Sequence, residues 1–74
     1  MTKTIYSKEH KYITEKLRQA RKEAGLDQIQ VATRLNRTQS YVSKIESGQR
    51  RVDVIQLKKF AEIYKRKIDF FIKK

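Results

Sequence analysis

A run of uncharged hydrogen-bonding side chains lies just before two adjacent arginines in residues 38–51, which read TQSYVSKIESGQRR. A glutamine amide can pair bidentately with the edge of an adenine, a lysine can donate to guanine, and a serine hydroxyl is permissive. The planar guanidinium group of an arginine matches the oxygens of a phosphate group. This order of residue types therefore indicates a surface whose first part contacts bases and whose last part holds phosphate.

The net charge points to a polyanionic partner. The 74 residues contain 19 Lys and Arg against 8 Asp and Glu, which gives a formal net charge of +11. Such an excess favours nucleic acid, or an anionic membrane surface, as the partner. The excess of positive side chains is spread evenly along the chain, so charge alone does not locate the contact surface.

Size and composition narrow the class of protein. A chain of this length suits one compact domain with a modest core, and we expect residues 1–74 to form it, with a short basic extension over residues 1–7. The absence of cysteine excludes disulfides and thiolate chemistry and favours a reducing cytoplasm. We find neither a signal peptide nor an apolar run of about 20 residues, so we expect a soluble protein.

Hydrophobic periodicity predicts an all-α fold. The chain has no proline, and no alternating strand pattern of convincing length occurs. Side chains that favour helix caps and left-handed stops divide it into five helical segments. We expect the first helix to lie between a possible cap at Ser7 and a stop at Gly25. The second is expected over residues 28–35 after a cap at Asp27, and the third over residues 39–47 after a cap at Thr38. A fourth helix should follow a cap at Asp53, and a final turn is expected over residues 69–72.

The second and third segments have the spacing of a helix-turn-helix, whose second helix can lie in the major groove of DNA. This geometry needs a small residue where the two helices approach, and Ala32 supplies it. It also needs a sharp turn, which Asn36 tolerates in the left-handed conformation. Val42 and Ile45 provide the inner face of the second helix.

Four features follow one another along the chain: a Gly-Leu-x-Gln sequence at the start of the helix-turn-helix, a Val-Ala pair, a Ser-Lys-Ile-Glu-x-Gly sequence at its end, and an amphipathic helix. The stretches that contain them are LRQARKEAGLDQIQVATRLNRTQSYVSKIESGQRR and VDVIQLKKFAEIYKRKIDFFI. From about Leu17 to Ile72 the chain thereby resembles the phage-repressor and Cro-like helix-turn-helix family, often called the Xre family. Asn36 stands where that family often has glycine, and Val52 where proline is common. Neither departure touches a candidate contact.

The resemblance implies a compact five-helix lambda-repressor-like DNA-binding domain with a central helix-turn-helix at about residues 28–47. It implies a sequence-specific, double-stranded DNA-binding transcriptional regulator, which we expect to be a repressor that binds a palindromic operator as a homodimer. Such a protein would be cytoplasmic and associated with the nucleoid when bound to DNA.

Base readers are expected at the N-terminal end of the second helix, which enters the groove in such folds, and one helical turn further on. Tyr41 is ambiguous, because it could contact a thymine methyl or a phosphate, or pack over Ile29 or Leu35. The expected base readers are Gln39, Ser40 and Lys44, with Tyr41 as a further candidate.

Phosphate contacts are expected around that helix. Gln28 begins the preceding helix, where free backbone N–H groups and the helix dipole favour an anion, although ordinary helix-end polarity would also explain it. The arginines that flank the second helix could clamp the DNA strands on either side, and the alternative is a merely solvated charge run. The expected phosphate contacts are Gln28, Arg37, Ser43, Arg50 and Arg51.

The resemblance also implies a structural ion pair. In the family, an arginine of the first helix and a glutamate that ends the recognition helix form a partly buried pair, and Arg21 and Glu46 match those positions. Such a pair would fix the recognition helix without reading sequence.

The apolar residues near the end of the sequence are difficult to place in one small core, because consecutive helical residues point in different directions. We therefore expect part of this segment to form a symmetric dimer contact. The candidates are Tyr64, Ile68, Phe70, Phe71 and Ile72.

Other classes of function fit less well. An enzyme is not expected, because there is no glycine-rich phosphate loop, cysteine nucleophile or evident carboxylate pair. His10 has no second ligand at metal spacing, and no cofactor or small-molecule ligand is indicated. A basic membrane-surface peptide would need wide continuous apolar stripes. The stronger alternative is an antitoxin or phage-type regulator that acts mainly through a protein partner, with DNA binding secondary.

Overall fold

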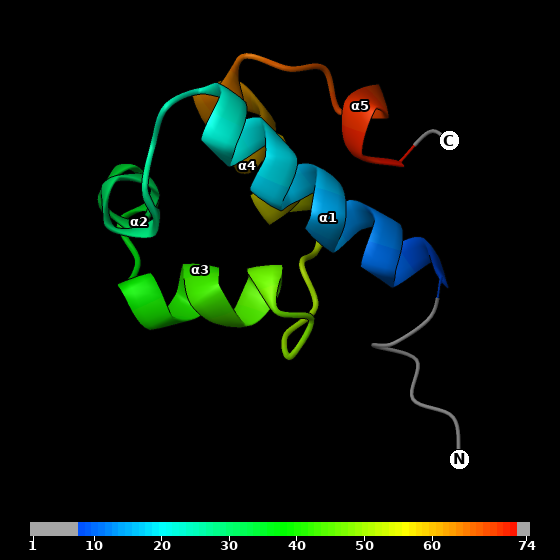
Figure 1. Cartoon of the computed structure of the whole chain (residues 1–74), viewed down its shortest axis with the longest axis horizontal. Coiled ribbons are helices and arrows are strands. Elements are labelled where there is room, and N and C mark those ends of the chain that lie inside the picture. The colour runs from blue at the N-terminus through cyan, green and yellow to red at the C-terminus, as the bar shows by residue number, and fades with distance from the viewer. Residues whose placement is uncertain (1–7, 73–74) are drawn as a thin grey trace.

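The computed structural model describes residues 8–72, and every regular element in this range is a helix (Figure 1). The expected all-α, five-helix architecture is confirmed. The basic extension expected over residues 1–7 and the possible cap at Ser7 lie outside the described residues. The helices are α1 (Lys8–Glu23), α2 (Gln28–Leu35), α3 (Gln39–Glu46), α4 (Val54–Tyr64) and α5 (Asp69–Ile72).

Three of the helices begin at the caps that the sequence predicts. Asp27 and Gln30 form a reciprocal capping box: Asp27 Oδ1 accepts from the Gln30 backbone N–H at 2.7 Å, and Gln30 Oε1 accepts from the Asp27 N–H at 2.9 Å. Thr38 and Asp53 each accept one backbone N–H from the first turn of α3 and α4. These bonds satisfy donors that a helix start would otherwise leave unpaired.

Left-handed residues make the turns that change the chain direction. Asn36 (φ 60°) ends α2 and leaves one residue, Arg37, before the cap of α3, so asparagine fills the turn without glycine. Gly48 (φ 86°) follows α3, where a residue without Cβ adopts this conformation freely. Lys65 (φ 58°) ends α4 in the same way, and nothing in its residue type indicates this.

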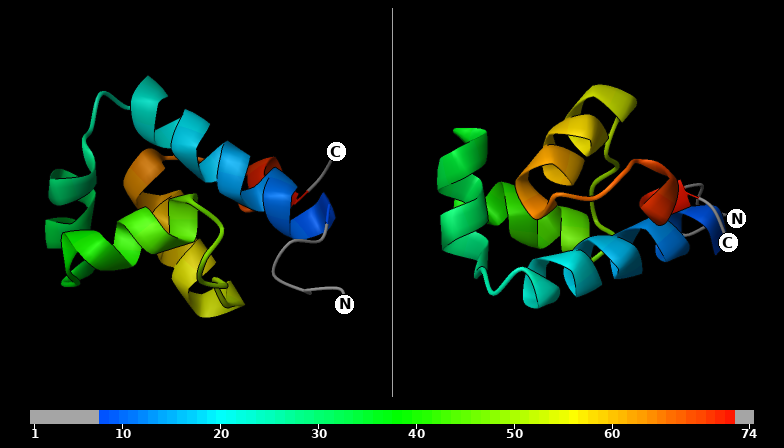
Figure 2. Two further views of the ribbon diagram at one scale, coloured as in Figure 1. Left: turned by 60° about the horizontal axis from the view of Figure 1, so that its bottom comes forward. Right: turned by 90° about the horizontal axis from the view of Figure 1, so that it is seen from above.

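All five helices contribute to one core, and α1 contacts α3, α4 and α5 (Figure 2). Most apolar positions at helical spacing are buried, although Val54, at the start of α4, is 63% exposed. Because α2 and α3 pack directly on each other, the small side chain of Ala32 permits their close approach. The buried apolar residues are Leu17, Ala20, Val31, Ala32, Leu35, Val42, Ile45, Leu57, Phe60, Ala61, Tyr64 and Phe71.

The expected dimer contact is wrong for Tyr64 and Phe71. Tyr64, the last residue of α4, is only 5% exposed and belongs to the core. Phe71 has no exposed surface, because α5 packs beside α1 and places this side chain in the core. Phe70 is half-buried, with the cations of Lys16 and Arg66 lying over its ring at 4.9 and 4.5 Å from the centroid. Ile72 remains 53% exposed and Ile68 half-buried, so these two are the residues still suited to a contact with another chain.

Candidate nucleic-acid interface

Helix α3 has one face in the core and one face in solvent. Val42, Ile45 and Glu46 are buried and fix how the helix is rotated about its axis. The spacing of 3.6 residues per turn then turns Gln39, Ser40 and Lys44 outward, and all three are exposed. Gln39 and Ser40 therefore lie at the N-terminal end of the solvent face of α3, and Lys44 lies on the same face in the last turn.

The carboxylate of Glu46 joins α1, α2 and α3. Arg21 of α1 donates from Nε to Glu46 Oε2 at 2.8 Å and from Nη2 to Glu46 Oε1 at 3.1 Å, while its Nη1 donates to the carbonyl of Leu26 at 3.0 Å. Glu46 is 3% exposed and the Arg21 side chain 13%. The hydrogen bond to Glu46 raises the pKa of Arg21, whose guanidinium group is in any case charged at every working pH. Arg21 and Glu46 thus form the partly buried pair that the resemblance implies.

The amide of Gln28 extends this pair toward the exposed face of α3. Gln28 Nε2 donates to Glu46 Oε1 at 3.0 Å, and Gln28 Oε1 accepts from Gln39 Nε2 at 3.1 Å. An amide nitrogen carries two N–H groups, so one of them remains for a phosphate. Gln28 therefore holds Gln39 in place in addition to any contact with DNA that it makes.

Arg18 also contacts α3, and it is not among the functional residues predicted from the sequence. Its Nη2 donates to the backbone carbonyl of Glu46 at 2.7 Å, which caps the C-terminal end of α3 with a positive charge. Arg18 and Arg21 are three residues apart on α1 and reach the same end of α3. Helical spacing could have placed both arginines on one face, but the partner depends on how α1 packs against α3.

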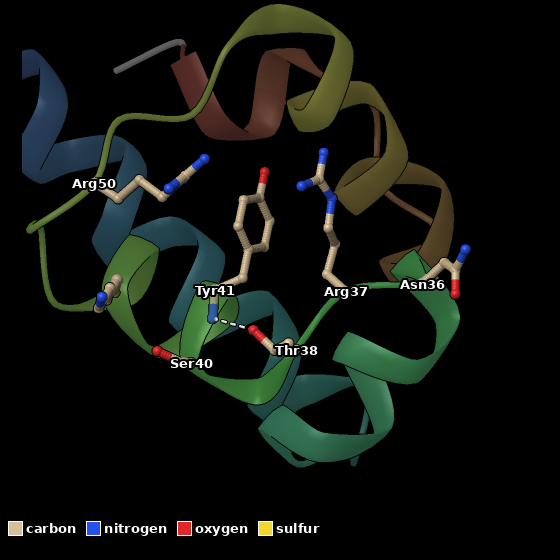
Figure 3. Close-up of a pocket in the computed structure, with 7 residues that line it drawn as sticks. Asn36, Arg37, Thr38, Ser40, Tyr41 and Arg50 are labelled. Atoms are coloured by element: carbon tan, nitrogen blue, oxygen red, sulfur yellow. Dashed lines mark hydrogen bonds between the residues drawn. The ribbon is translucent and has the colours of Figure 1, made fainter.

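Tyr41 lies between two arginines (Figure 3). The guanidinium carbons of Arg37 and Arg50 are 4.7 and 4.9 Å from the centroid of its ring. The three residues line an open hollow of about 510 Å³ beside α3, whose lining also includes Ser40 and Lys44 and contains no carboxylate. Tyr41 is half-buried and packs against the edge of the core, and its contact with DNA stays a prediction.

The remaining phosphate candidates lie in different surroundings. Arg51 is exposed and lines a separate hollow together with Glu9, His10 and Val52, and Arg50 does not line that hollow. Ser43 is half-buried on α3. The structure thus brings Arg37 and Arg50 together at Tyr41 and places Arg51 toward the start of α1.

The hydroxyl group of Tyr64 is buried near the ion pair and has no hydrogen-bond partner among the described residues. Burial, and to a lesser extent the negative charge of Glu46, raises the pKa of Tyr64 well above its usual value of 10.0. Below pH 10 the phenol is protonated in both the folded and the unfolded chain. Above it only the unfolded chain ionises this group, so Tyr64 lowers stability as the pH rises past 10.

We expect Tyr64→Phe to remove this alkaline loss. The free energy of unfolding, measured by denaturant titration at several values between pH 8 and 11, should fall less steeply for the variant than for the wild type. At neutral pH the variant should be at least as stable, because the replaced hydroxyl is buried and unpaired. If the free energy of unfolding fell equally steeply with pH in the two proteins, the alkaline loss of stability would not come from Tyr64.

Over the described residues, no helix combines the length and apolar character needed to cross a bilayer. The same part of the chain contains no group of three or more His, Cys, Asp or Glu side chains arranged to hold a metal ion.

One known protein family matches most of the chain. The model of the helix-turn-helix family matches residues 17–71, a range that runs from α1 to α5 and contains α2, α3 and the loops around them. A search of curated proteins finds no match. The matched family is one of DNA-binding regulators and not one of enzymes. The chain therefore belongs to the Cro/C1-type helix-turn-helix family, as a DNA-binding transcription regulator of that type.

Proposed function

We propose that the protein is a repressor that binds a palindromic operator in double-stranded DNA as a homodimer, with α3 in the major groove. The observation that carries this proposal is the solvent face of α3, where Gln39, Ser40 and Lys44 are exposed beside a hollow without carboxylates. Bound repressor would occlude a promoter. The protein would act in the cytoplasm, associated with the nucleoid.

The proposed contacts divide into base readers and phosphate contacts. Gln39, Ser40 and Lys44 have the exposure and residue types that base readout requires. Arg37 and Arg50 are exposed cations beside α3, and Arg51 is an exposed cation in the loop after α3 that faces the start of α1; all three suit phosphate contacts. Gln28 and Ser43 are half-buried, so their contacts with phosphate would come from the edge of the interface.

A dimer would place two α3 helices on one face of the duplex. Ile72, 53% exposed, and the half-buried Ile68 are the residues we assign to that contact. Dimers of this geometry read two half-sites about one helical turn apart, which corresponds to an inverted repeat about 10 base pairs from centre to centre.

Selection of bound sequences from a random duplex pool tests the proposed function. The selection should be repeated at two salt concentrations, because phosphate contacts make affinity depend steeply on salt. We expect an inverted repeat to be recovered at both. Recovery of a single half-site would contradict the dimer, and sequence-blind binding would contradict base readout.

Variants at Lys44 and Arg51 should separate the two kinds of contact. Lys44→Ala is expected to weaken binding to the selected site by about 1–3 kcal/mol and to relax the preference at one base pair. Arg51→Ala should weaken binding to all sequences by the same factor, because a phosphate carries no sequence information. Titration of both variants against the selected duplex and a scrambled duplex measures this. If Lys44→Ala lost the same amount of affinity for both duplexes, Lys44 would not be a base reader.

One observation favours a second function that depends on a protein partner. Val54 and Ile55, at the start of α4, are each 63% exposed, which is unusual for two adjacent large apolar side chains. A regulator of the antitoxin type would use such a surface for another protein and DNA binding would be secondary. Sequence-blind binding in the selection would move this alternative to first place.

A further inference from the structure

Arg37 and Arg50 come from different segments and meet at one aromatic ring. Arg37 belongs to the turn between α2 and α3, and Arg50 to the loop after α3. Figure 3 shows the two side chains on either side of Tyr41, with the tyrosine hydroxyl at the end of the ring between the ends of the two arginines. The guanidinium carbons are 4.7 and 4.9 Å from the ring centroid.

No carboxylate accounts for this arrangement. The hollow around Tyr41 contains Arg37, Arg50 and Lys44 as its charged residues, and neither arginine forms an ion pair within the described part of the chain. Two like charges on either side of one ring repel each other, and their attraction to the aromatic faces does not neutralise either charge. An anion at the hydroxyl end of the Tyr41 ring, within reach of the ends of both arginine side chains, would be attracted by both.

We propose that Arg37 and Arg50 bind one and the same backbone phosphate of the DNA and that Tyr41 is the residue that positions them. Guanidinium groups bind phosphate oxygens through N–H donors, and the phenolic O–H can donate to one of the same two non-bridging oxygens. The site differs from a clamp in which the two arginines hold separate strands. It rests on the proposed function, since it takes a DNA phosphate as its ligand.

The salt dependence of binding distinguishes one shared phosphate from two separate ones. The logarithm of the binding constant falls with the logarithm of salt concentration by about 0.9 for each phosphate neutralised on duplex DNA. With one shared phosphate, Arg37→Ala or Arg50→Ala alone should change this slope little, and the double variant should reduce it by about 0.9 per bound protomer. With two phosphates, each single variant should reduce it by about 0.9 and the double variant by about 1.8.

The measurement uses the full chain and a duplex of random sequence, because phosphate contacts do not depend on sequence. Stoichiometry, measured in the same titrations, gives the slope per protomer. We expect the double variant to bind roughly tenfold or more weakly at about 0.1 M salt, since charge-assisted hydrogen bonds are lost. Lys59→Ala, which removes an exposed lysine of α4, is the matched control and should leave the slope unchanged.

Variants of Tyr41 test its positioning role. Tyr41→Phe keeps the ring between the arginines, so the effects of Arg37→Ala and Arg50→Ala should remain coupled as in the wild type. Tyr41→Leu removes the ring, and the effects of the two arginine substitutions should then become additive. A Tyr41 that only packs against the core would change the melting temperature without changing this coupling. Equal coupling in the Leu variant and the wild type would therefore overturn the positioning role.

The outcomes separate this site from the proposed function. If the wild type fails to bind duplex DNA, both are wrong. If it selects an operator but each arginine reduces the slope by about 0.9, the shared phosphate is overturned and the repressor function stands. If binding is sequence-blind but the single variants leave the slope intact and the double variant lowers it, the phosphate site stands and base readout fails.

Discussion

Glu46→Ala is expected to destabilise the protein by about 3–5 kcal/mol, because it leaves the guanidinium group of Arg21 buried without its counter-charge. The pair has 3% and 13% exposed side chains and two direct hydrogen bonds, so little solvent can replace the lost carboxylate. The core of a domain of this size supplies about 3–5 kcal/mol in all, so the variant should be largely unfolded at 25 °C. Far-ultraviolet circular dichroism with urea titration measures this.

The double variant Arg21→Met/Glu46→Leu is the control for this expectation. Apolar replacements of similar volume remove both charges together, and stability should return to within about 1–2 kcal/mol of the wild type. The refolded protein would still lack the carboxylate that holds Gln28, and through it Gln39. Its affinity for the selected operator should therefore drop although it is folded. A stable single Glu46→Ala variant would mean that the pair contributes nothing to the fold.

The sequence predicts those parts of the fold that depend on neighbours in the chain. The caps at Asp27, Thr38 and Asp53 act within one helical turn, and the buried positions follow helical spacing. The turn at Asn36 follows from a backbone preference of that residue type. For the same reason the exposed and buried faces of α3 could be assigned before any tertiary contact was known.

The parts that the sequence did not reveal depend on distant segments. Arg37 and Arg50 are thirteen positions apart, and their meeting at Tyr41 requires the orientation of two loops around α3. The hydrogen bond from Gln39 to Gln28 likewise needs the packing of α2 on α3. In α5, helical periodicity separates Phe71 from Ile72, but only the contact with α1 decides which of them is buried.

Phe71→Ala is the second substitution with a large expected effect. Phe71 is one of the largest fully buried side chains, and truncation of a buried phenylalanine costs about 3–5 kcal/mol through lost burial and the cavity that remains. The loss is comparable to the whole stability expected for the domain. Thermal unfolding should therefore show a much lower midpoint or no cooperative transition.

Ile72→Ala provides the matched control, because Ile72 is the next residue and is 53% exposed. In a monomer, its truncation should change stability by no more than about 0.5 kcal/mol. The dependence on protein concentration distinguishes a core residue from a dimer contact, since only dissociation makes the midpoint rise with concentration. The loss caused by Phe71→Ala should be the same at micromolar and at hundredfold higher concentration. If high concentration restored the midpoint of the Phe71→Ala variant, Phe71 would belong to the contact between subunits and the position of α5 beside α1 would be wrong.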